Sequence, residues 1–194
     1  MNIKWKEFPR KAKRGPQVIL PKDAAIIAAY TSLESGNKVV DAGTGSGWLA
    51  AYLAKIVAPK GELITYEHRP EFAKLAKKNF KRFGIKNIKL KEKDIYKGIC
   101  EKNLDLITLD LQKPWKVISH AEKALKENSY VVVYSPQITQ ALEFVNALED
   151  SKLKFEKTIE ILERKWKIKG KVARPEHRML GHTGFLTFVR KLTK

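Results

Sequence analysis

Apolar residues along the chain follow two alternating patterns, one typical of strands and one typical of helices. Short apolar or alternating runs predict strands at residues 38–42, 62–67, 88–93, 104–111 and 130–134. Apolar residues at helical spacing predict helices at residues 48–58, 71–83, 117–126 and 139–148. Because strands and helices alternate, this part of the chain predicts βα units around a parallel sheet.

The pattern changes after residue 150. Residues 155–169 alternate between polar and apolar, and residues 184–189 form another strand-like run, with a polar loop containing Gly170, Pro175 and Gly181 between them. Two strands joined without a helix predict an antiparallel hairpin at one edge of the sheet. The whole pattern therefore predicts an α/β fold with a doubly wound, mostly parallel seven-stranded sheet and an antiparallel C-terminal hairpin.

The length and composition fit one globular domain. The chain has 194 residues, of which 43% are hydrophobic, which is enough for a full core. Its single cysteine, Cys100, cannot form an internal disulfide and suits a reducing compartment. Residues 1–13 contain no apolar segment typical of a signal peptide, and no apolar run reaches membrane-spanning length. We therefore expect a cytoplasmic protein with no membrane partner.

Positive charge is concentrated at the two ends of the chain. The formal net charge is +18; residues 1–22 contain seven Lys or Arg and one acid, and residues 152–194 contain thirteen and four. A nearly balanced core between basic ends favours a polyanion-binding surface around a small-molecule site. A lysine-rich thermophilic composition is the alternative, but it raises Glu together with Lys and explains the uneven ends less well. We expect a basic N-terminal arm at residues 1–15 and one folded domain at residues 16–194.

The segment 39–47 is the most informative stretch. An apolar run reaches Asp41, and three glycines then alternate with small hydroxyl residues before a helix begins. Without Cβ atoms, a ligand can lie directly on the backbone. No P-loop spacing occurs, and a dinucleotide fingerprint would need a small residue where Trp48 stands. The spacing Asp-x-Gly-x-Gly-x-Gly resembles the S-adenosyl-L-methionine loop of Rossmann-like methyltransferases, with a tight turn that binds nothing as the alternative.

Acidic residues follow the predicted strands one after another. Asp41, Glu67, Asp94 and Asp110 each end a strand, at the edge where open parallel sheets bind ligands. Any one of them could be a helix N-cap, whereas four in succession favour a ligand site. Asp41 suits a cationic sulfonium, Glu67 has the position of a ribose-binding acid, and Asp94 could accept from an adenine amino group.

Several segments together resemble a known enzyme family. They are residues 14–23, 41–47, 66–73, 109–115, 135–137 with 140, and 174–186. The most specific are Asp-Leu-x-x-Pro-Trp at 110–115 and Gly-His-Thr-Gly-Phe-Leu at 181–186. They resemble the tRNA (adenine-N1)-methyltransferases of archaea and bacteria. The chain departs from that family in two ways: only residues 1–13 precede the matching part, where members usually have an N-terminal β domain, and Trp48 replaces a small residue.

This resemblance implies a Rossmann-like S-adenosyl-L-methionine-dependent methyltransferase that modifies N1 of a T-loop adenine in tRNA, at position 58 and in archaeal members often also 57. It implies S-adenosyl-L-homocysteine as the product, a homotetramer as the assembly, and Asp110 as the catalytic residue at the target base. The expected cofactor-binding residues are Gln17, Asp41, Gly43, Thr44, Gly45, Ser46, Gly47, Trp48, Glu67, Asp94 and Ile95.

Contacts with RNA are expected at the base pocket and near the ends of the chain. Trp115 would form a wall of the base pocket. The expected tRNA-binding residues are Trp115, Arg14, Arg174, His177, Arg178 and His182, with Lys11 and Lys13 beside Arg14. For each cation a solvated loop is an equal alternative. His177 and His182 lack the Cys or acid that would complete a tetrahedral set, so we expect no metal.

Three other functions stay open at this point. A small-molecule methyltransferase of the precorrin type, or a protein isoaspartyl methyltransferase, fits the short N-terminus better and the basic ends worse. A non-catalytic tRNA-binding subunit would be expected to lose the glycine loop or the acids, and this chain keeps both. A dinucleotide oxidoreductase is disfavoured by Trp48.

Overall fold

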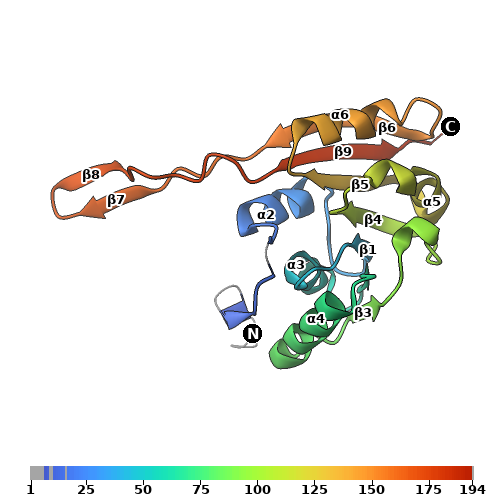
Figure 1. Ribbon diagram of the computed structural model, residues 1–194, viewed down its shortest axis with the longest axis horizontal. Coiled ribbons are helices and arrows are strands. Elements are labelled where there is room, and N and C mark those ends of the chain that lie inside the picture. The colour runs from blue at the N-terminus through green and yellow to red at the C-terminus, as the bar shows by residue number, and fades with distance from the viewer. Residues whose placement is uncertain (1–6, 9–10, 16, 194) are drawn as a thin grey trace.

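The computed structural model describes residues 7–8, 11–15 and 17–193, and a seven-stranded sheet lies at its centre (Figure 1). The strand order is β3-β2-β1-β4-β5-β9-β6. The strands are β1 (Lys38–Ala42), β2 (Glu62–Tyr66), β3 (Ile88–Lys91), β4 (Leu104–Leu109), β5 (Leu125–Ser135), β6 (Leu153–Glu160) and β9 (Phe185–Lys191). Neighbours from β3 to β5 pair in parallel, and β9 runs antiparallel between β5 and β6. The predicted mostly parallel, seven-stranded α/β sheet is confirmed.

Helices cover both faces of this sheet. They are α2 (Pro21–Tyr30), α3 (Trp48–Val57), α4 (Pro70–Phe83), α5 (Ile118–Ala124) and α6 (Ile138–Asn146), with 3-10 turns η1 (Ile95–Lys97) and η2 (Pro114–Val117). One apolar core joins α2, α3 and α4 to one face through side chains such as Val39, and a second joins α5 and α6 to the other face through side chains such as Val40. Successive residues of β1 serve opposite cores because strand side chains alternate.

Local sequence signals explain where several elements begin and end. Strand β1 has the predicted bounds, and α4 begins at Pro70, whose missing N–H costs nothing in the first helical turn. Helix α4 ends at Gly84, which adopts the left-handed φ of 64° that glycine tolerates. Helix α2 was not predicted, because its buried residues are mostly small and give a weak periodic pattern.

The C-terminal strands correct one prediction. The run 155–169 is not one strand: β6 ends at Glu160, and a separate pair follows, β7 (Trp166–Lys169) and β8 (Val172–Pro175). The last register pair of β6 and β9 joins Glu160 to Phe185, so the residues beyond them have no partner in the main sheet. They pair with each other and form a two-stranded ribbon that projects far from the body (Figure 1).

A second correction concerns the segment predicted as a helix at residues 117–126. It divides into η2, α5 and the first residues of β5, which begins at Leu125. Leu125 is buried in the core and pairs with Leu104 of β4. The tertiary contacts of an apolar residue therefore override the helical periodicity at this point.

The described part of the basic N-terminal segment packs on the folded domain. Phe8 is 2% exposed, and its ring lies 5.6 Å from Trp48 and 5.0 Å from Phe83. The Lys13 N–H donates to Asn79 on α4 at 3.1 Å. These contacts hold the described part of the segment against helices α3 and α4.

Candidate active site

The glycine loop connects β1 to α3, and two of its positions require glycine for different reasons. Gly47 has a φ of 83°, and a Cβ there would lie 2.5 Å from the Phe80 ring, so close packing on α4 requires glycine. Gly45 has a φ of 54°, and a Cβ there would meet nothing within 4 Å. Gly45 therefore combines a left-handed backbone with open space, which allows a ligand to approach the peptide.

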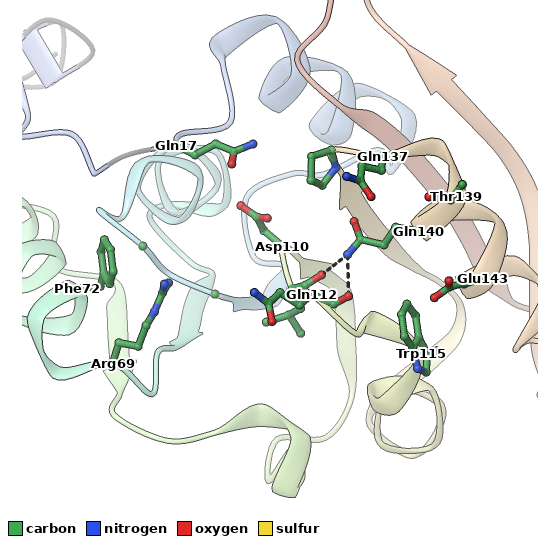
Figure 2. Close-up of a pocket in the computed structure, with 14 residues that line it drawn as sticks. Gln17, Arg69, Phe72, Asp110, Gln112, Trp115, Gln137, Thr139, Gln140 and Glu143 are labelled. Carbon is green, nitrogen blue, oxygen red and sulfur yellow. Dashed lines mark hydrogen bonds between the residues drawn. The ribbon is translucent and has the colours of Figure 1, made fainter.

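Two cavities meet at the carboxyl ends of the strands. The first has a volume of about 660 Å³ and the second about 330 Å³. Both are lined by Gly43, Arg69, Asp110, Leu111 and Gln112. The first continues along Gln17, Phe72, Trp115, Pro136, Gln137, Thr139, Gln140 and Glu143 (Figure 2). The second continues along Tyr66, Glu67, Asp94 and Ile95. A ligand could therefore extend from one cavity into the other past Asp110.

Glu67 organises the junction of the two cavities. Its carboxylate is almost fully buried and accepts from the Gly45 N–H at 3.0 Å and from the Arg69 N–H at 3.0 Å. The Arg69 Nε–H donates to the same carboxylate at 3.1 Å. Arg69 also lies over the Phe72 ring, with 4.1 Å between the guanidinium carbon and the ring centroid. Glu67 thus holds the glycine loop and a cation in one arrangement.

Asp94 and Ile95 also line the second cavity. The Asp94 carboxylate accepts from the Tyr96 N–H at 2.9 Å and caps η1. The helix-cap alternative is therefore realised here, and the same residue also lines the cavity. One carboxylate oxygen can serve the cap while the other faces a ligand.

Asp41 and Trp48 are placed differently from what we expected, because neither is among the residues that line these two cavities. Asp41 is buried and accepts from the hydroxyls of Thr65 at 2.7 Å and Thr108 at 2.8 Å, which ties β1 to β2 and β4. Burial raises the pKa of Asp41 to about 6. Trp48 is 7% exposed and belongs to the apolar core beside Phe8. Asp41 therefore supports the site by tying its strands together, and Trp48 supports it by packing in the core.

Asp110 is the acid that reaches the middle of the site. It follows β4, and its carboxylate points into the first cavity between Gln17 and the glycine loop (Figure 2). Burial raises the pKa of Asp110 to about 7, the carboxylates of Asp41 and Glu67 add to this rise, and the Arg69 guanidinium opposes it. A carboxyl group in a cleft whose pKa lies near neutral pH is typical of a functional site.

The far wall of the first cavity is held by α6. The Gln140 side-chain amide donates to the carbonyls of Leu111 at 2.7 Å and Gln112 at 2.9 Å (Figure 2). These bonds fix the loop that follows Asp110, and Trp115 forms the wall beside it. The arrangement offers a flat aromatic surface, several amides and two acids, Asp110 and Glu143, which suits the recognition of a planar polar ligand.

The structure brings together only some of the expected site residues. Gln17, Gly43, Gly45, Asp110 and Trp115 line the first cavity, and Glu67, Asp94 and Ile95 line the second. Thr44, Ser46 and Gly47 are buried within the loop. Reasoning from the sequence missed Arg69, Phe72 and Gln140, although all three stand in segments that carried the resemblance.

The cations proposed for RNA are not among the residues that line these two cavities. Arg14 lies over the Trp48 ring, with 4.3 Å from its guanidinium carbon to the centroid. Arg174 is on β8, and His177 and Arg178 follow it on the projecting ribbon. His182 lies at the base of the ribbon, where Nδ1 contacts the Glu160 carboxylate and Nε2 contacts the Pro136 carbonyl at 2.8 Å. His182 is therefore already engaged with the protein on both ring nitrogens.

The described residues offer neither a metal-binding cluster nor a membrane-spanning helix. No cluster of three or more His, Cys, Asp or Glu side chains in that part of the chain could hold a metal ion. Among the same residues, no helix is both long enough and apolar enough to span a bilayer.

The proteins that this chain is similar to are methyltransferases. A family profile described as the tRNA methyltransferase complex GCD14 subunit matches residues 11–173. The tRNA (adenine(57)-N(1)/adenine(58)-N(1))-methyltransferase TrmI of Methanocaldococcus jannaschii is 38% identical, over 93% of this chain and 74% of that protein. The crystal structure of tRNA (m1A58) methyltransferase TrmI from Aquifex aeolicus has a TM-score of 0.88 at 31% identity, over 97% of this chain and 76% of that one. A SAM-dependent O-methyltransferase from Thermotoga maritima has a TM-score of 0.90 at 32% identity, over 98% and 72%.

Proposed function

Because the chain belongs to the family of the tRNA methyltransferase complex GCD14 subunit, we propose that it transfers a methyl group from S-adenosyl-L-methionine to N1 of an adenine in tRNA. The two cavities hold the cofactor and the base. The target is adenine 58 of the T-loop, with adenine 57 as a second position. The observation that carries the proposal is the place of Asp110, where the second cavity, lined by Glu67 and Asp94, meets the first cavity, which is walled by Trp115.

The residues of the second cavity fit the adenosine part of S-adenosyl-L-methionine. Glu67 offers a buried carboxylate for ribose hydroxyls, and Asp94 can accept from the adenine amino group beside the apolar Ile95. The open space at Gly45 leaves the backbone accessible where the methionine part would lie. When bound, S-adenosyl-L-methionine supplies an electrophilic methyl group on a sulfonium.

The first cavity then has to position the base and stabilise the charge that develops on it. Adenine N1 carries a free lone pair, so its attack needs no prior deprotonation, only alignment at near contact distance. Methylation places positive charge on the ring, shared with the exocyclic amino group. The Asp110 carboxylate accepts from that amino group, and this hydrogen bond strengthens as the charge grows, which stabilises the transition state selectively.

Mapping the modified nucleotide tests this proposal directly. The purified protein is incubated with S-adenosyl-L-methionine and an unmodified tRNA transcript, and the product is digested and analysed by mass spectrometry. We expect 1-methyladenosine at position 58 of the T-loop fragment, and an A58G transcript should lose the modification at that position. Methylation of a small molecule or a protein in place of tRNA would contradict the proposal and favour the precorrin-type or isoaspartyl alternatives. Binding without methyl transfer would favour the non-catalytic subunit.

We also propose that the protein works as a homo-oligomer held by the projecting ribbon. The register of β7 and β8 pairs Trp166 with Pro175 and Ile168 with Ala173 on one face. Trp166 is 57% exposed and Ile168 is 77% exposed. An isolated two-stranded ribbon is marginally stable in water, and exposed apolar patches of this kind mark interaction sites. A second copy of the chain is the partner that we propose for this face.

The opposite face of the ribbon is basic. Lys167 pairs with Arg174 across the two strands, and Lys169 lies on the same side. We propose that this face contacts tRNA phosphates, in agreement with the expectation for Arg174, and that His177 and Arg178 extend it.

The exposed, unpaired Cys100 supports the cytoplasm as the compartment in which we expect the enzyme to work.

A further inference from the structure

A second basic surface lies on α4, well away from the ribbon in Figure 1. The exposed residues of this surface, which we call the α4 lysine face, are Lys74, Lys77, Lys78, Lys81 and Arg82. At 3.6 residues per turn they occupy about 140° of the helix circumference. The buried residues of α4, such as Ala76 and Phe83, lie on the opposite side. The cations are therefore concentrated on one continuous stripe.

This charge is largely uncompensated. Lys77 pairs with Glu92, and among the residues that the structure describes Lys74, Lys78 and Lys81 have no acidic partner within 4.0 Å. Lys74 and Lys78, like Lys77 and Lys81, are four residues apart, a spacing at which like charges destabilise a helix. An ion-pair network of the thermophilic kind would place acids between them. The repulsion points to a binding partner that supplies negative charge.

The lysines also line a groove that adjoins the first cavity along the chain. A groove of about 460 Å³ is lined by Pro70, Glu92 and four residues of the α4 lysine face, Lys74, Lys77, Lys78 and Lys81. Arg69 and Phe72, on either side of Pro70, line the first cavity. Helix α4 has 14 residues and is about 21 Å long. A nucleic acid with one base in the cavity can therefore lay its backbone along the helix.

We propose that the α4 lysine face binds the phosphate backbone of tRNA, as a contact surface separate from the ribbon; this inference rests on the proposed function. A T-loop adenine must be turned out of its stack to reach Asp110, which costs a few kcal/mol. Phosphate contacts beside the cavity offset that cost and hold the RNA in register. The partner is the same RNA molecule that supplies the base, because Pro70 in the groove directly follows Arg69 in the wall of the first cavity.

The test compares two triple variants with matched loss of charge. In the first, Lys74, Lys78 and Lys81 are each replaced by Gln. In the control, Lys60, Lys123 and Lys152 are replaced by Gln; these are exposed and lie at the opposite rim of the sheet, before β2, β5 and β6. Affinity for an unmodified tRNA transcript is measured by fluorescence anisotropy across a series of KCl concentrations, with S-adenosyl-L-methionine binding and melting temperature recorded for each protein.

We expect the α4 variant to bind tRNA at least ~10-fold more weakly at the lowest salt, with the slope of log K against log salt reduced by about 2 to 3. Its S-adenosyl-L-methionine affinity should stay at the parent level, and its melting temperature should not fall. A slope equal to that of the control overturns the inference. If the parent methylates tRNA while both variants bind alike, only this inference fails. If the parent transfers no methyl group, the proposed function fails, and the slopes still decide this surface.

Discussion

At the scale of single residues, Asp110 is the group on which the chemistry depends. We expect Asp110→Ala to slow single-turnover methylation by ~10²-fold or more, because the hydrogen bond that strengthens in the transition state is lost. S-adenosyl-L-methionine affinity should stay nearly unchanged, since Glu67 and Asp94 are the residues proposed to hold the adenosine part. Rapid quench with labelled cofactor and calorimetry measure the two quantities. A single-turnover rate equal to that of the parent would remove Asp110 from the catalytic role.

The same carboxyl group predicts how stability depends on pH. Its pKa is raised to about 7 in the folded state from the ordinary value of 3.8, so the folded protein holds a proton that the unfolded chain has lost. The stabilising contribution of the neutral form is complete below pH 4 and disappears as pH rises through about 7. Asp110→Asn, which stays neutral, should therefore flatten the fall in unfolding free energy over that range. Parallel denaturation profiles for parent and variant would contradict this pKa.

His182 shows a role that the sequence did not suggest. Its two ring nitrogens face a carboxylate on Glu160 and a carbonyl on Pro136, and both of these groups only accept. The contact with Glu160 raises the pKa of His182 above 6.5, so the bridge is complete below that value and is lost as pH rises through the raised pKa. We expect Glu160→Gln to lower the His182 pKa in an NMR titration. An unchanged titration would show that this pair does not form in solution.

At the scale of secondary-structure elements, the turn from β1 to α3 depends on Gly47. Gly47→Ala forces a Cβ into the Phe80 ring at 2.5 Å and keeps a φ of 83°, so we expect it to destabilise the fold by about 2–5 kcal/mol. Gly84→Ala is the matched control: φ is 64° but nothing lies within 4 Å of the added atom. The control should cost only about 1–2 kcal/mol. Urea denaturation gives both values, and equal losses would contradict the packing argument.

The elements that could be predicted are those fixed by local signals. Strand β1 and helix α4 follow from an apolar run and from Pro70 and Gly84, which act within a few residues. The division of 155–169 could not be predicted, because its alternation is the same in the main sheet and in the ribbon. Only the end of pairing at Glu160 and Phe185, which are far apart in sequence, separates them. Long-range pairing is information that a local pattern does not contain.

The residues of the candidate site also divide into those that local sequence signals predict and those that contacts with distant residues decide. The glycine loop and the acids at the strand ends could be read from spacing, because parallel strands deliver them to one edge. The inward turn of Asp41 could not, since it depends on Thr65 and Thr108 in neighbouring strands. The burial of Trp48 also could not, because it depends on Phe8, forty residues earlier. Partners chosen by the fold decide which of several similar residues faces the ligand.

At the scale of the whole molecule, the ribbon predicts the oligomeric state and a separate role in RNA binding. We expect a double variant, Trp166→Ser with Ile168→Thr, to sediment as a smaller species than the parent, because an apolar interface loses both of its large residues. The control is Lys167→Gln with Lys169→Gln, on the other face of the same strand. Analytical ultracentrifugation measures the mass of each, and a parent that sediments as a monomer would contradict the proposed assembly.

The two faces of the ribbon should separate in a second measurement. The control variant keeps the apolar face and should therefore keep the parent's mass, but it loses two candidate phosphate contacts, so the salt slope of tRNA binding should fall by about 1 to 2. The apolar variant should keep the full slope per bound copy, because its cations are intact. If the apolar variant instead lowers the slope as much as the basic one does, tRNA is held by the assembled oligomer and not by the basic face of each ribbon alone.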